Sequence, residues 1–530
     1  MDLATWSWIF LVLYVGAMVG FGWMGSRQVA NADDFATARG AYGPFFLALA
    51  FAATTASGAT FLGSPALAYQ WGMPAVLGNV LYPISLYFGV LVCMRLIATS
   101  GNRFGNRSIP EYLGDRYQSD GIRILVSIFS LMLLFYLAGQ LVSGLVMFET
   151  MLGLSDAWAL GITTVVLMVY VTMGGAHADI LTDGVQGALM LVLGAVVIVL
   201  FVVGAGFDGG LPEALDKVEE SDPRHLGFLN EATPLYHSWW AILAILFAHM
   251  PLGLLPHIGN KLWALKGGED QRMFVKLAFM IGLIMAMLVL AGVLARGMFD
   301  DALLQAGANP NEALPKLFIE LFPTWLAALI GVGVLCAVMS TADGLVISSS
   351  QIVANDLYRR SIAPRIHPDL PEEEIDRRVL SISRWSTVIV LAACAALAWA
   401  LMDYNIALIV WIGVGGMMAA FAGPLVLGAL WRGVTRTGAY AGLVSGMTVF
   451  IILHSGILNP DWFSATPLFG PVSWLKGEAP NPFSCSAMGE IVSVAVTYGV
   501  SRVSKPLPEQ HLDEMFGGAA QSGEAPVAAD

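Results

Sequence analysis

Long apolar segments recur along the chain from its first residues to about residue 502, and short polar connections separate them. A helix needs about 20 mostly apolar residues to cross the hydrocarbon core of a bilayer. Thirteen segments come close to or exceed that length, and the predicted fold class is an all-α, polytopic membrane protein. The predicted transmembrane helices are 5–24, 43–70, 74–98, 124–152, 157–174, 178–206, 237–257, 274–296, 322–357, 384–402, 405–431, 437–456 and 484–502.

The distribution of Lys and Arg predicts how these helices are oriented. With the N-terminus outside, all but five of the 26 basic residues fall on cytoplasmic segments, and the five exceptions are Lys217, Arg224, Arg296, Lys316 and Lys476. Cytoplasmic loops of membrane proteins carry an excess of Lys and Arg. We therefore predict an external N-terminus, external loops at 207–236 and 457–483, and a cytoplasmic C-terminus.

Composition supports one membrane domain and excludes several other classes. The chain is 57% hydrophobic and 12% charged, whereas soluble domains are about 25% charged. A net charge of −13 without a long basic run excludes a nucleic-acid-binding surface. We predict a single membrane domain over 1–505, with the lipid bilayer as its surroundings and no obligatory protein partner. The acidic, Pro-containing segment 506–530 is predicted to be a disordered cytoplasmic tail.

Two of the predicted spans carry residues that favour a break in the helix. The middle of span 43–70 is small and hydroxylic from Ala52 to Thr60, and span 237–257 contains Pro251, Gly253 and Pro256. Proline removes a backbone donor and interrupts a helix. Transporters built from inverted repeats often begin each repeat with such a helix. We predict a five-plus-five repeat core with halves at about 43–206 and 237–431.

A break in the first of these helices would expose backbone oxygens. The carbonyls of Ala53 and Ala56 would lose their intrahelical partners, and a hard cation prefers oxygen ligands. Small residues also allow helices to pack closely, so this alternative stays open for span 43–70. A plain kink stays open for span 237–257.

The span 322–357 carries the complementary polar groups. Ser340 and Thr341 are adjacent hydroxyls near its middle, although such hydroxyls often bond to their own helix. Asp343 lies two residues further on, and Asp183 lies near the inner end of span 178–206. A carboxylate within a membrane is costly and indicates function, but Asp183 could instead lie in interfacial water.

An ordered set of motifs resembles the sodium:solute symporter family. The motifs are ADDFATARG (32–40), SIPEYLGDRY (108–117), Thr182-Asp183 with Gln186, MSTAD in span 322–357 followed by Asn355 to Tyr358, and GPLVLGALWRGVTRTGAYAGLVSG (423–446). The resemblance implies a leucine-transporter-like inverted-repeat fold in a bacterial inner membrane. It also implies sodium as the coupling ion and a small-molecule solute.

The resemblance also implies site residues. The sodium ligands would be the carbonyls of Ala53, Ala56 and Ala337 and the hydroxyls of Ser340 and Thr341, with Asp183 on the inward exit route of the ion. The solute would lie between the two broken helices. The candidate solute-binding residues are Thr55, Ser57, Thr60, Asn79, His249, Pro251 and Trp411.

The sequence departs from the proline carriers of the family in two places. Those carriers use an acidic group near sodium, whereas this chain has Thr54-Thr55-Ala56-Ser57. The inner end of the seventh span reads Pro256-His257-x-x-x-Lys261, with Lys where relatives carry Arg. Both departures disfavour proline as the solute. His249 could bind a solute carboxylate or could bond to a neighbouring backbone oxygen.

These observations lead to one functional hypothesis and its alternatives. We predict a sodium-coupled symporter that imports a small carboxylate by alternating access. A proton-coupled carrier stays open because Asp183, Asp343 and His249 could titrate, and so does a sensor or channel of the same fold. The sequence contains no HExxH, GxSxG or Walker motif, so we do not expect an enzyme.

Overall fold

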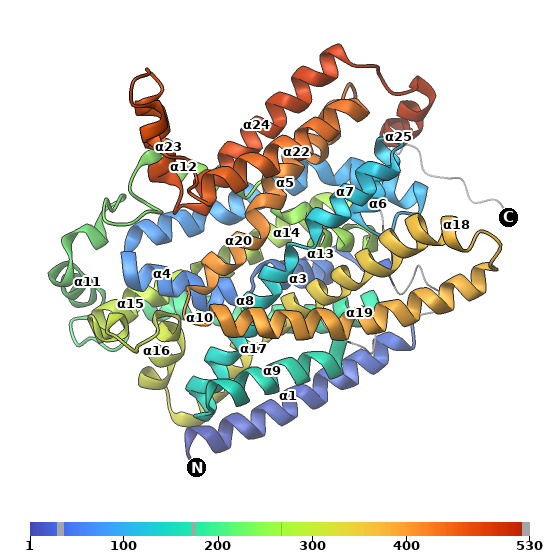
Figure 1. The fold of residues 1–530 in the computed structure, drawn as a ribbon. Coiled ribbons are helices and arrows are strands. Elements are labelled where there is room, and N and C mark those ends of the chain that lie inside the picture. The colour runs from blue at the N-terminus through green and yellow to red at the C-terminus, as the bar shows by residue number, and fades with distance from the viewer. Residues whose placement is uncertain (29–35, 172–174, 267, 522–530) are drawn as a thin grey trace.

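The computed structural model describes residues 1–28, 36–171, 175–266 and 268–521. Within these ranges, ten helical segments are long and apolar enough to cross a membrane (Figure 1). They are α1 (Leu3–Ser26), α5 (Met73–Phe104), α7 (Asp120–Ser130) with α8 (Leu133–Leu152), α10 (Gly175–Val203), α14 (Gly268–Ala286) with α15 (Leu290–Phe299), α17 (Thr324–Gln351), α19 (Glu372–Leu401), α20 (Ile406–Phe421), α22 (Arg436–His454) and α24 (Pro482–Val503). The all-α, polytopic fold class is confirmed.

Two further spans are bent, as the sequence predicted. The first joins α3 (Pro44–Thr55) to a π-helical turn (Ala59–Gly63) and α4 (Ser64–Trp71), with a bend of 62°. The second joins α12 (Trp239–Ala248) to α13 (Pro256–Gly259), with a bend of 51° across Leu254 and Pro256. Both breaks lie in the middle of apolar segments, where the backbone must be buried or line a cavity.

The number of spans reaches twelve if each bent pair counts as one. The remaining predicted span, 157–174, coincides with α9 (Asp156–Val171). Its described apolar stretch, Asp156–Met168, is shorter than the helices counted as spans, and 172–174 lie outside the described residues. The count of thirteen therefore stays a prediction.

Helix α17 forms the centre of the protein. It packs against α1, α3, α8 and α10, and its side chains from Val334 to Val346 are all buried. By contrast, α1 and α10 expose large apolar side chains such as Val12, Leu13 and Val202. Exposed apolar surface of this kind suits contact with lipid. The polar residues of α17 are therefore enclosed by protein, and that is where polar groups inside a membrane are tolerated.

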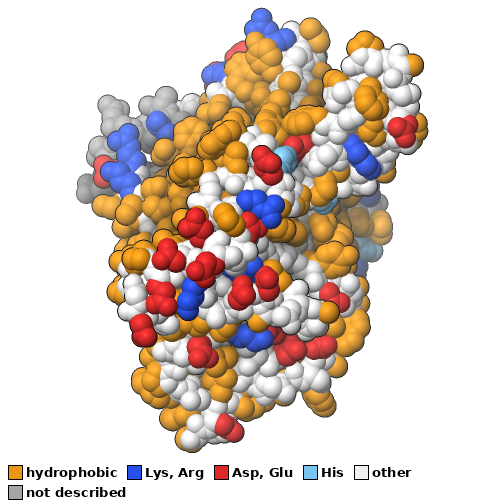
Figure 2. All heavy atoms as spheres, turned by 90° about the vertical axis from the view of Figure 1, so that its left-hand side faces the viewer, with side chains coloured by type: hydrophobic (Ala, Val, Ile, Leu, Met, Phe, Trp, Pro, Cys, Tyr) orange, Lys and Arg blue, Asp and Glu red, His pale blue; other side chains and the backbone are white. Residues whose placement is uncertain are grey.

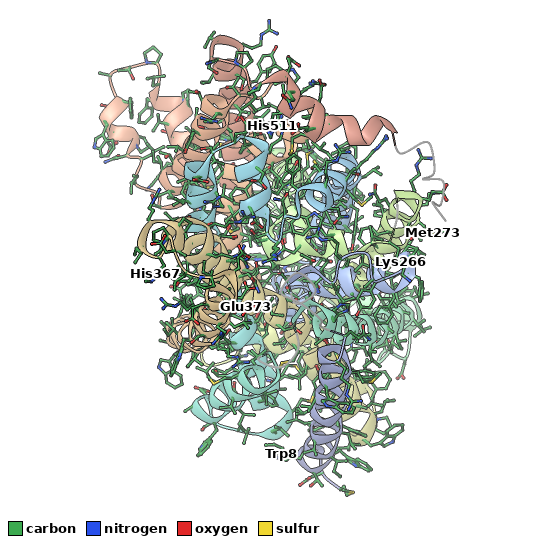
Figure 3. The ribbon with its side chains drawn as sticks, turned by 90° about the vertical axis from the view of Figure 1, so that its right-hand side faces the viewer. Trp8, Lys266, Met273, His367, Glu373 and His511 are labelled. Atoms are coloured by element: carbon green, nitrogen blue, oxygen red, sulfur yellow. The ribbon has the colours of Figure 1, made fainter. Side chains whose placement is uncertain are left out.

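The two ends of the molecule carry different polar elements. Figure 1 shows α11 (Gly210–Ser221) and the start of α1 at one end, and α18 (Ala363–Ile366) and α25 (Glu509–Gln521) at the other. Figure 2 shows acidic side chains gathered on the α11 end, where Asp216, Glu219 and Glu220 are exposed. Figure 3 views the opposite end, where Lys266, His367, Glu373 and His511 lie. The start of α1 and helix α25 thus lie at opposite ends of the molecule.

The prediction of a disordered tail from residue 506 is wrong for its first part. Residues 509–521 form α25, which packs on α5 and buries Leu512 and Met515. Arg432 pairs with Glu509 and Asp513, and the buried Arg116 guanidinium lies over the Phe516 ring. These contacts come from segments distant in sequence, so local composition could not reveal them. Residues 522–530 lie outside the described residues.

Candidate sodium and solute sites

The break after α3 redirects three backbone carbonyls to side-chain donors. The carbonyl of Ala53 accepts a hydrogen bond from the Ser340 hydroxyl (3.1 Å), and that of Thr54 accepts from Thr341 (3.0 Å). The carbonyl of Thr55 accepts from the Tyr82 hydroxyl (2.8 Å). An intact helix would supply backbone amides to these oxygens. The break therefore creates a row of oxygens beside α17.

Close approach of α8 helps to fix this break. A Cβ atom on Gly58 would lie 2.2 Å from the Ser143 hydroxyl oxygen, so only glycine fits here without displacement. The Gly58 amide donates to the Gln140 side chain (3.0 Å), and the Ala59 amide donates to the Ser57 hydroxyl (3.2 Å). The amides that start the second half of the span thus have partners within the protein.

The structure brings together three of the five predicted sodium ligands. The Ser340 hydroxyl lies 3.1 Å from the Ala53 carbonyl and 3.3 Å from that of Ala337. Thr341 is beside them but contacts the Thr54 carbonyl, which sequence reasoning did not select. Ala56 is buried where α3 ends. The hydroxyls of Ser340 and Thr341 both reach across to α3, so the alternative that they bond only to their own helix is wrong.

Asp183 lies directly behind this cluster of oxygens. Its carboxylate accepts from the Thr54 hydroxyl (2.7 Å) and pairs with the Lys261 ammonium. Asp183 is fully buried, so the alternative of a place in interfacial water is wrong. Asp179 and Asp343 are buried nearby, and carboxylate oxygens of all three acids lie within 4.8 Å of one another. The sequence analysis missed Asp179, although its spacing of four from Asp183 places both on one helix face.

A cavity lies on the other side of the broken helix α3–α4. It contains six of the seven predicted solute-binding residues, namely Thr55, Ser57, Thr60, Asn79, His249 and Trp411. Thr55 and Ser57 flank Ala56, so the same short segment contributes to the cavity and, through Ala53, to the oxygen cluster. This adjacency can couple an ion to a solute.

Pro251 is the one predicted solute residue that does not line the cavity. It is buried at the end of the α12 segment, and its carbonyl accepts the Leu254 amide (2.9 Å). Its ring shapes the break because it cannot donate a backbone hydrogen bond. Leu252, one residue further on, lines the cavity instead.

Aromatic rings form one wall of the cavity. His249 makes edge contacts with Trp411 (4.5 Å between centroids) and Tyr82 (4.9 Å), and Trp411 contacts Phe483 (4.3 Å). The sequence analysis missed Tyr82, Phe483, Tyr136 and Tyr236, which also line the cavity. Phe483 belongs to α24, outside the predicted repeats, so no motif pointed to it. The proline at position 83, inside α5, was the available signal for its neighbour Tyr82.

The polar groups of the cavity are neutral in type. No Asp, Glu, Lys or Arg is among its described lining residues. The His249 Nδ1 atom lies 2.6 Å from the Ile245 carbonyl, which confirms the expected backbone partner. If Nδ1 carries the proton, Nε2 is left as an acceptor. Asn79 donates to the Ala286 carbonyl (2.5 Å) and accepts from Ser64 (3.1 Å).

Comparison with known proteins places the chain among cation-coupled carriers. The model of the sodium:solute symporter family matches residues 35–446. The chain is 26% identical to a sodium/pantothenate symporter of Haemophilus influenzae over 82% of this chain and 87% of that one. It is 27% identical to a sodium/proline symporter of Salmonella typhimurium, over 91% and 95% of the two chains.

Solved structures show the same fold. A sodium-coupled sialic acid symporter in a substrate-bound, outward-open state aligns with a TM-score of 0.72 and 18% identity, over 95% of this chain and 99% of that one. A nucleobase-cation-symport-1 family transporter in a closed conformation aligns with a TM-score of 0.52 and 14% identity, over 92% and 99% of the chains. Both likenesses support the predicted inverted-repeat architecture.

The buried oxygen cluster, the adjoining cavity and these comparisons agree on function. The protein is an integral membrane protein, its coupling ion is sodium, and its activity is symport of a small organic solute. The family match covers most of the chain and spans both broken helices. The chain belongs to the sodium:solute symporter family.

Proposed function

We propose that this protein imports a small carboxylate together with sodium across the bacterial plasma membrane, with its N-terminus outside and its C-terminus in the cytoplasm. Residues 1–505 act as one transport domain and carry no catalytic chemistry. The observation that carries the proposal is the shared segment 53–57, which contributes both to the oxygen cluster and to the cavity.

Sodium is proposed to bind where α3 ends, against α17. The ligands are the carbonyls of Ala53, Ala56 and Ala337 and the hydroxyls of Ser340 and Thr341. Two of these carbonyls already lie within hydrogen-bond distance of Ser340, so a small cation can replace the hydroxyl protons as the partner of these oxygens. Oxygen-only coordination suits a hard cation. Asp183 then attracts the ion inward after release.

The solute is proposed to bind in this cavity through Thr55, Ser57, Thr60, Asn79, His249 and Trp411. No acidic side chain lines this cavity to repel an anion. A sodium ion beside Ala56 would place a positive charge next to Thr55 and Ser57, where attraction is strong because the surroundings have a low dielectric constant. The backbone amides at the break contribute less to binding an anion, because those of Gly58 and Ala59 already have partners.

A carboxylate solute agrees with the names of two similar symporters. Both are named for pantothenate, whose carboxylate is joined to a body with methyl groups, hydroxyls and an amide. The aromatic wall formed by Trp411, Tyr82 and Phe483 suits the apolar part of the solute. The neutral acceptor of His249 suits a hydroxyl or amide hydrogen of the solute. Proline is less favoured, because the acidic group near sodium that proline carriers use is absent from 54–57.

Alternating access couples the two binding events. Sodium that closes the break around 53–57 also completes one side of the solute cavity, so each ligand raises the affinity for the other. Such coupling is typically about 1–3 kcal/mol and is reciprocal. A membrane potential of about 100 mV adds roughly 2.3 kcal/mol for each charge moved. At about 1.4 kcal/mol per tenfold, the membrane potential alone supports between about tenfold and a hundredfold accumulation of the solute.

The test is uptake into liposomes that contain the purified protein. Labelled pantothenate, acetate, pyruvate, lactate, proline and a sugar are offered under an inward sodium gradient, and separately under an inward proton gradient without sodium. We expect sodium-driven uptake of one of the carboxylates. Sodium-driven uptake of only zwitterionic proline or the neutral sugar would contradict the proposal that the solute is an anionic carboxylate. Uptake that follows only the proton gradient would favour the proton-coupled alternative, and no uptake would favour the sensor.

A further inference from the structure

A second polar cluster lies on the inner side of the proposed sodium site. Asp179 and Asp183 on α10 and Asp343 on α17 are all buried, and their carboxylate oxygens lie within 4.8 Å of one another. Three buried carboxylates at this distance repel one another and lose their hydration, so the arrangement needs a compensating cation or bound protons. The described chain supplies such a cation itself.

That cation is the ammonium group of Lys261. Lys261 follows α13 and is 4% exposed. Its Nζ atom lies 2.8 Å from Asp179 Oδ2 and 2.7 Å from the Thr54 hydroxyl, and it forms an ion pair with Asp183. An ammonium group has three hydrogens to donate, and these contacts give it three partners. Lys261 is therefore placed as a bound cation would be, in the middle of the acidic groups.

The cluster still has unused oxygen atoms. Within the described residues, the Oδ1 atoms of Asp179 and Asp183 are buried and have no hydrogen-bond partner. Both residues are more than nine-tenths buried. One ammonium group faces three carboxylates, so removing it would leave a strongly acidic, enclosed site with free oxygen ligands. Oxygen-rich acidic sites of this kind bind hard cations.

Lys261 also lies between the proposed sodium site and an inner cavity. On one side it contacts Thr54, whose carbonyl accepts from Thr341 in the oxygen cluster. On the other side Lys261 and Asp179 line a small cavity, together with His257, Asn260 and residues of α17. A sodium ion that moves inward from Ser340 and Thr341 past Asp183 therefore meets the Lys261 ammonium group.

We propose that Lys261 is a tethered cation that occupies the acidic cluster of Asp179, Asp183 and Asp343, so that this cluster does not bind a second sodium ion. The protein then binds one sodium ion, at Ser340 and Thr341, and the leaving ion exchanges with the Lys261 ammonium group at Asp183. This inference rests on the proposed sodium site. It assigns Lys261 the role of setting the number of bound sodium ions.

The experiment measures the number of radioactive sodium ions bound per purified protein at saturating sodium, without solute. We expect one ion for the wild type and two for Lys261→Gln, because the acidic cluster then lacks its internal cation. Lys261→Arg keeps the charge and should bind one. The matched control Lys276→Gln removes an exposed lysine from α14 and should also bind one. Lys261→Gln combined with Asp183→Asn should return the number to one.

A second measurement covers the case in which Lys261→Gln is too unstable to purify. The wild type and the Asp179→Asn variant are each titrated with sodium. If Lys261 fills the cluster, the wild type binds one ion with a Hill coefficient near 1, and Asp179→Asn leaves that number unchanged. Two ions bound to the wild type, with one lost in Asp179→Asn, would overturn the proposal.

The outcomes separate this inference from the proposed function. One ion bound to both the wild type and folded Lys261→Gln would overturn the role of Lys261 and leave the sodium site intact. No sodium bound to the wild type would instead overturn the proposed sodium site itself. Loss of the remaining ion in Lys261→Gln/Asp183→Asn when Ser340→Ala and Thr341→Ala are added identifies that ion as the one at α17.

Discussion

The two broken helices satisfy their backbones in different ways, and this difference separates their roles. At the first break, the carbonyls of Ala53, Thr54 and Thr55 accept from hydroxyls on α17 and α5. At the second break, tight local turns use the carbonyls, as when the amides of Leu252 and Leu254 donate to His249 and Pro251. The first break can therefore offer its backbone to an ion.

The second break contributes through side chains instead. His249, at its outer half, points its ring into the aromatic wall of the cavity. Lys261, beyond its inner half, lies in the acidic cluster. Carbonyls that already accept backbone amides offer little to a cation, whereas those that accept only a hydroxyl can exchange that partner. In the proposed function, the first break therefore forms the ion site, and the second positions side chains on either side of it.

The largest expected effect comes from the double variant Ser340→Ala/Thr341→Ala. Each hydroxyl is worth about 1–3 kcal/mol when its buried partner is left unsatisfied, so apparent sodium affinity should fall by roughly a hundredfold or more. Sodium-dependent uptake into liposomes measures the effect. The control is Ser386→Ala/Thr387→Ala on α19, an adjacent pair that bonds only to its own helix among the described contacts. Equal losses in both variants would argue against the ion site.

His249→Ala should have the next largest effect. It removes ring contacts with Trp411 and Tyr82 as well as a polar group in the cavity, worth about 1–2 kcal/mol together. We expect a rise of roughly tenfold in the KM for the solute at saturating sodium. His367→Ala, at the end of the molecule opposite α11 (Figure 3), is the control. An unchanged KM for His249→Ala would show that the second break does not contribute to solute binding.

Tyr82→Phe tests whether the hydroxyl on the Thr55 carbonyl matters. The substitution removes one hydrogen bond at the first break and keeps the ring, at a cost of about 1 kcal/mol. We expect the KM for the solute to rise about fivefold, because Thr55 lines the cavity. Tyr498→Phe on the exposed side of α24 is the matched control. A loss as large as that of the Ser340/Thr341 double variant would show that Tyr82 acts on the ion.

Pro251→Ala should have the smallest effect of the four. Pro251 does not line the cavity, and local turns already satisfy the second break. We expect less than about a twofold change in the KM for the solute, because alanine keeps the local turn and adds only one amide. Uptake kinetics measure it alongside His249→Ala. A tenfold loss would mean that proline at this position sets the cavity geometry and would weaken the contrast between the two breaks.

The sequence by itself determined the membrane fold, the two broken helices and most of the candidate site residues. Apolar length and the paired prolines are local signals, because the bilayer and the missing proline amide act on each segment separately. Ser340, Asp183, Thr55 and His249 were selected on such signals and on ordered motifs. The prediction of a disordered tail was wrong because it also used only local signals. Helix α25 is ordered by contacts with Arg116 and Arg432, which lie far away in sequence.

Only the tertiary structure decided which groups meet. The partner of Thr341 is Thr54, Phe483 joins the cavity from a helix outside the repeats, and Pro251 is left out of the cavity. The position of Lys261 among Asp179, Asp183 and Thr54 brings together residues up to 207 positions apart. No local pattern encodes such distances, because they arise when separate helices pack and bury each charge against its partner.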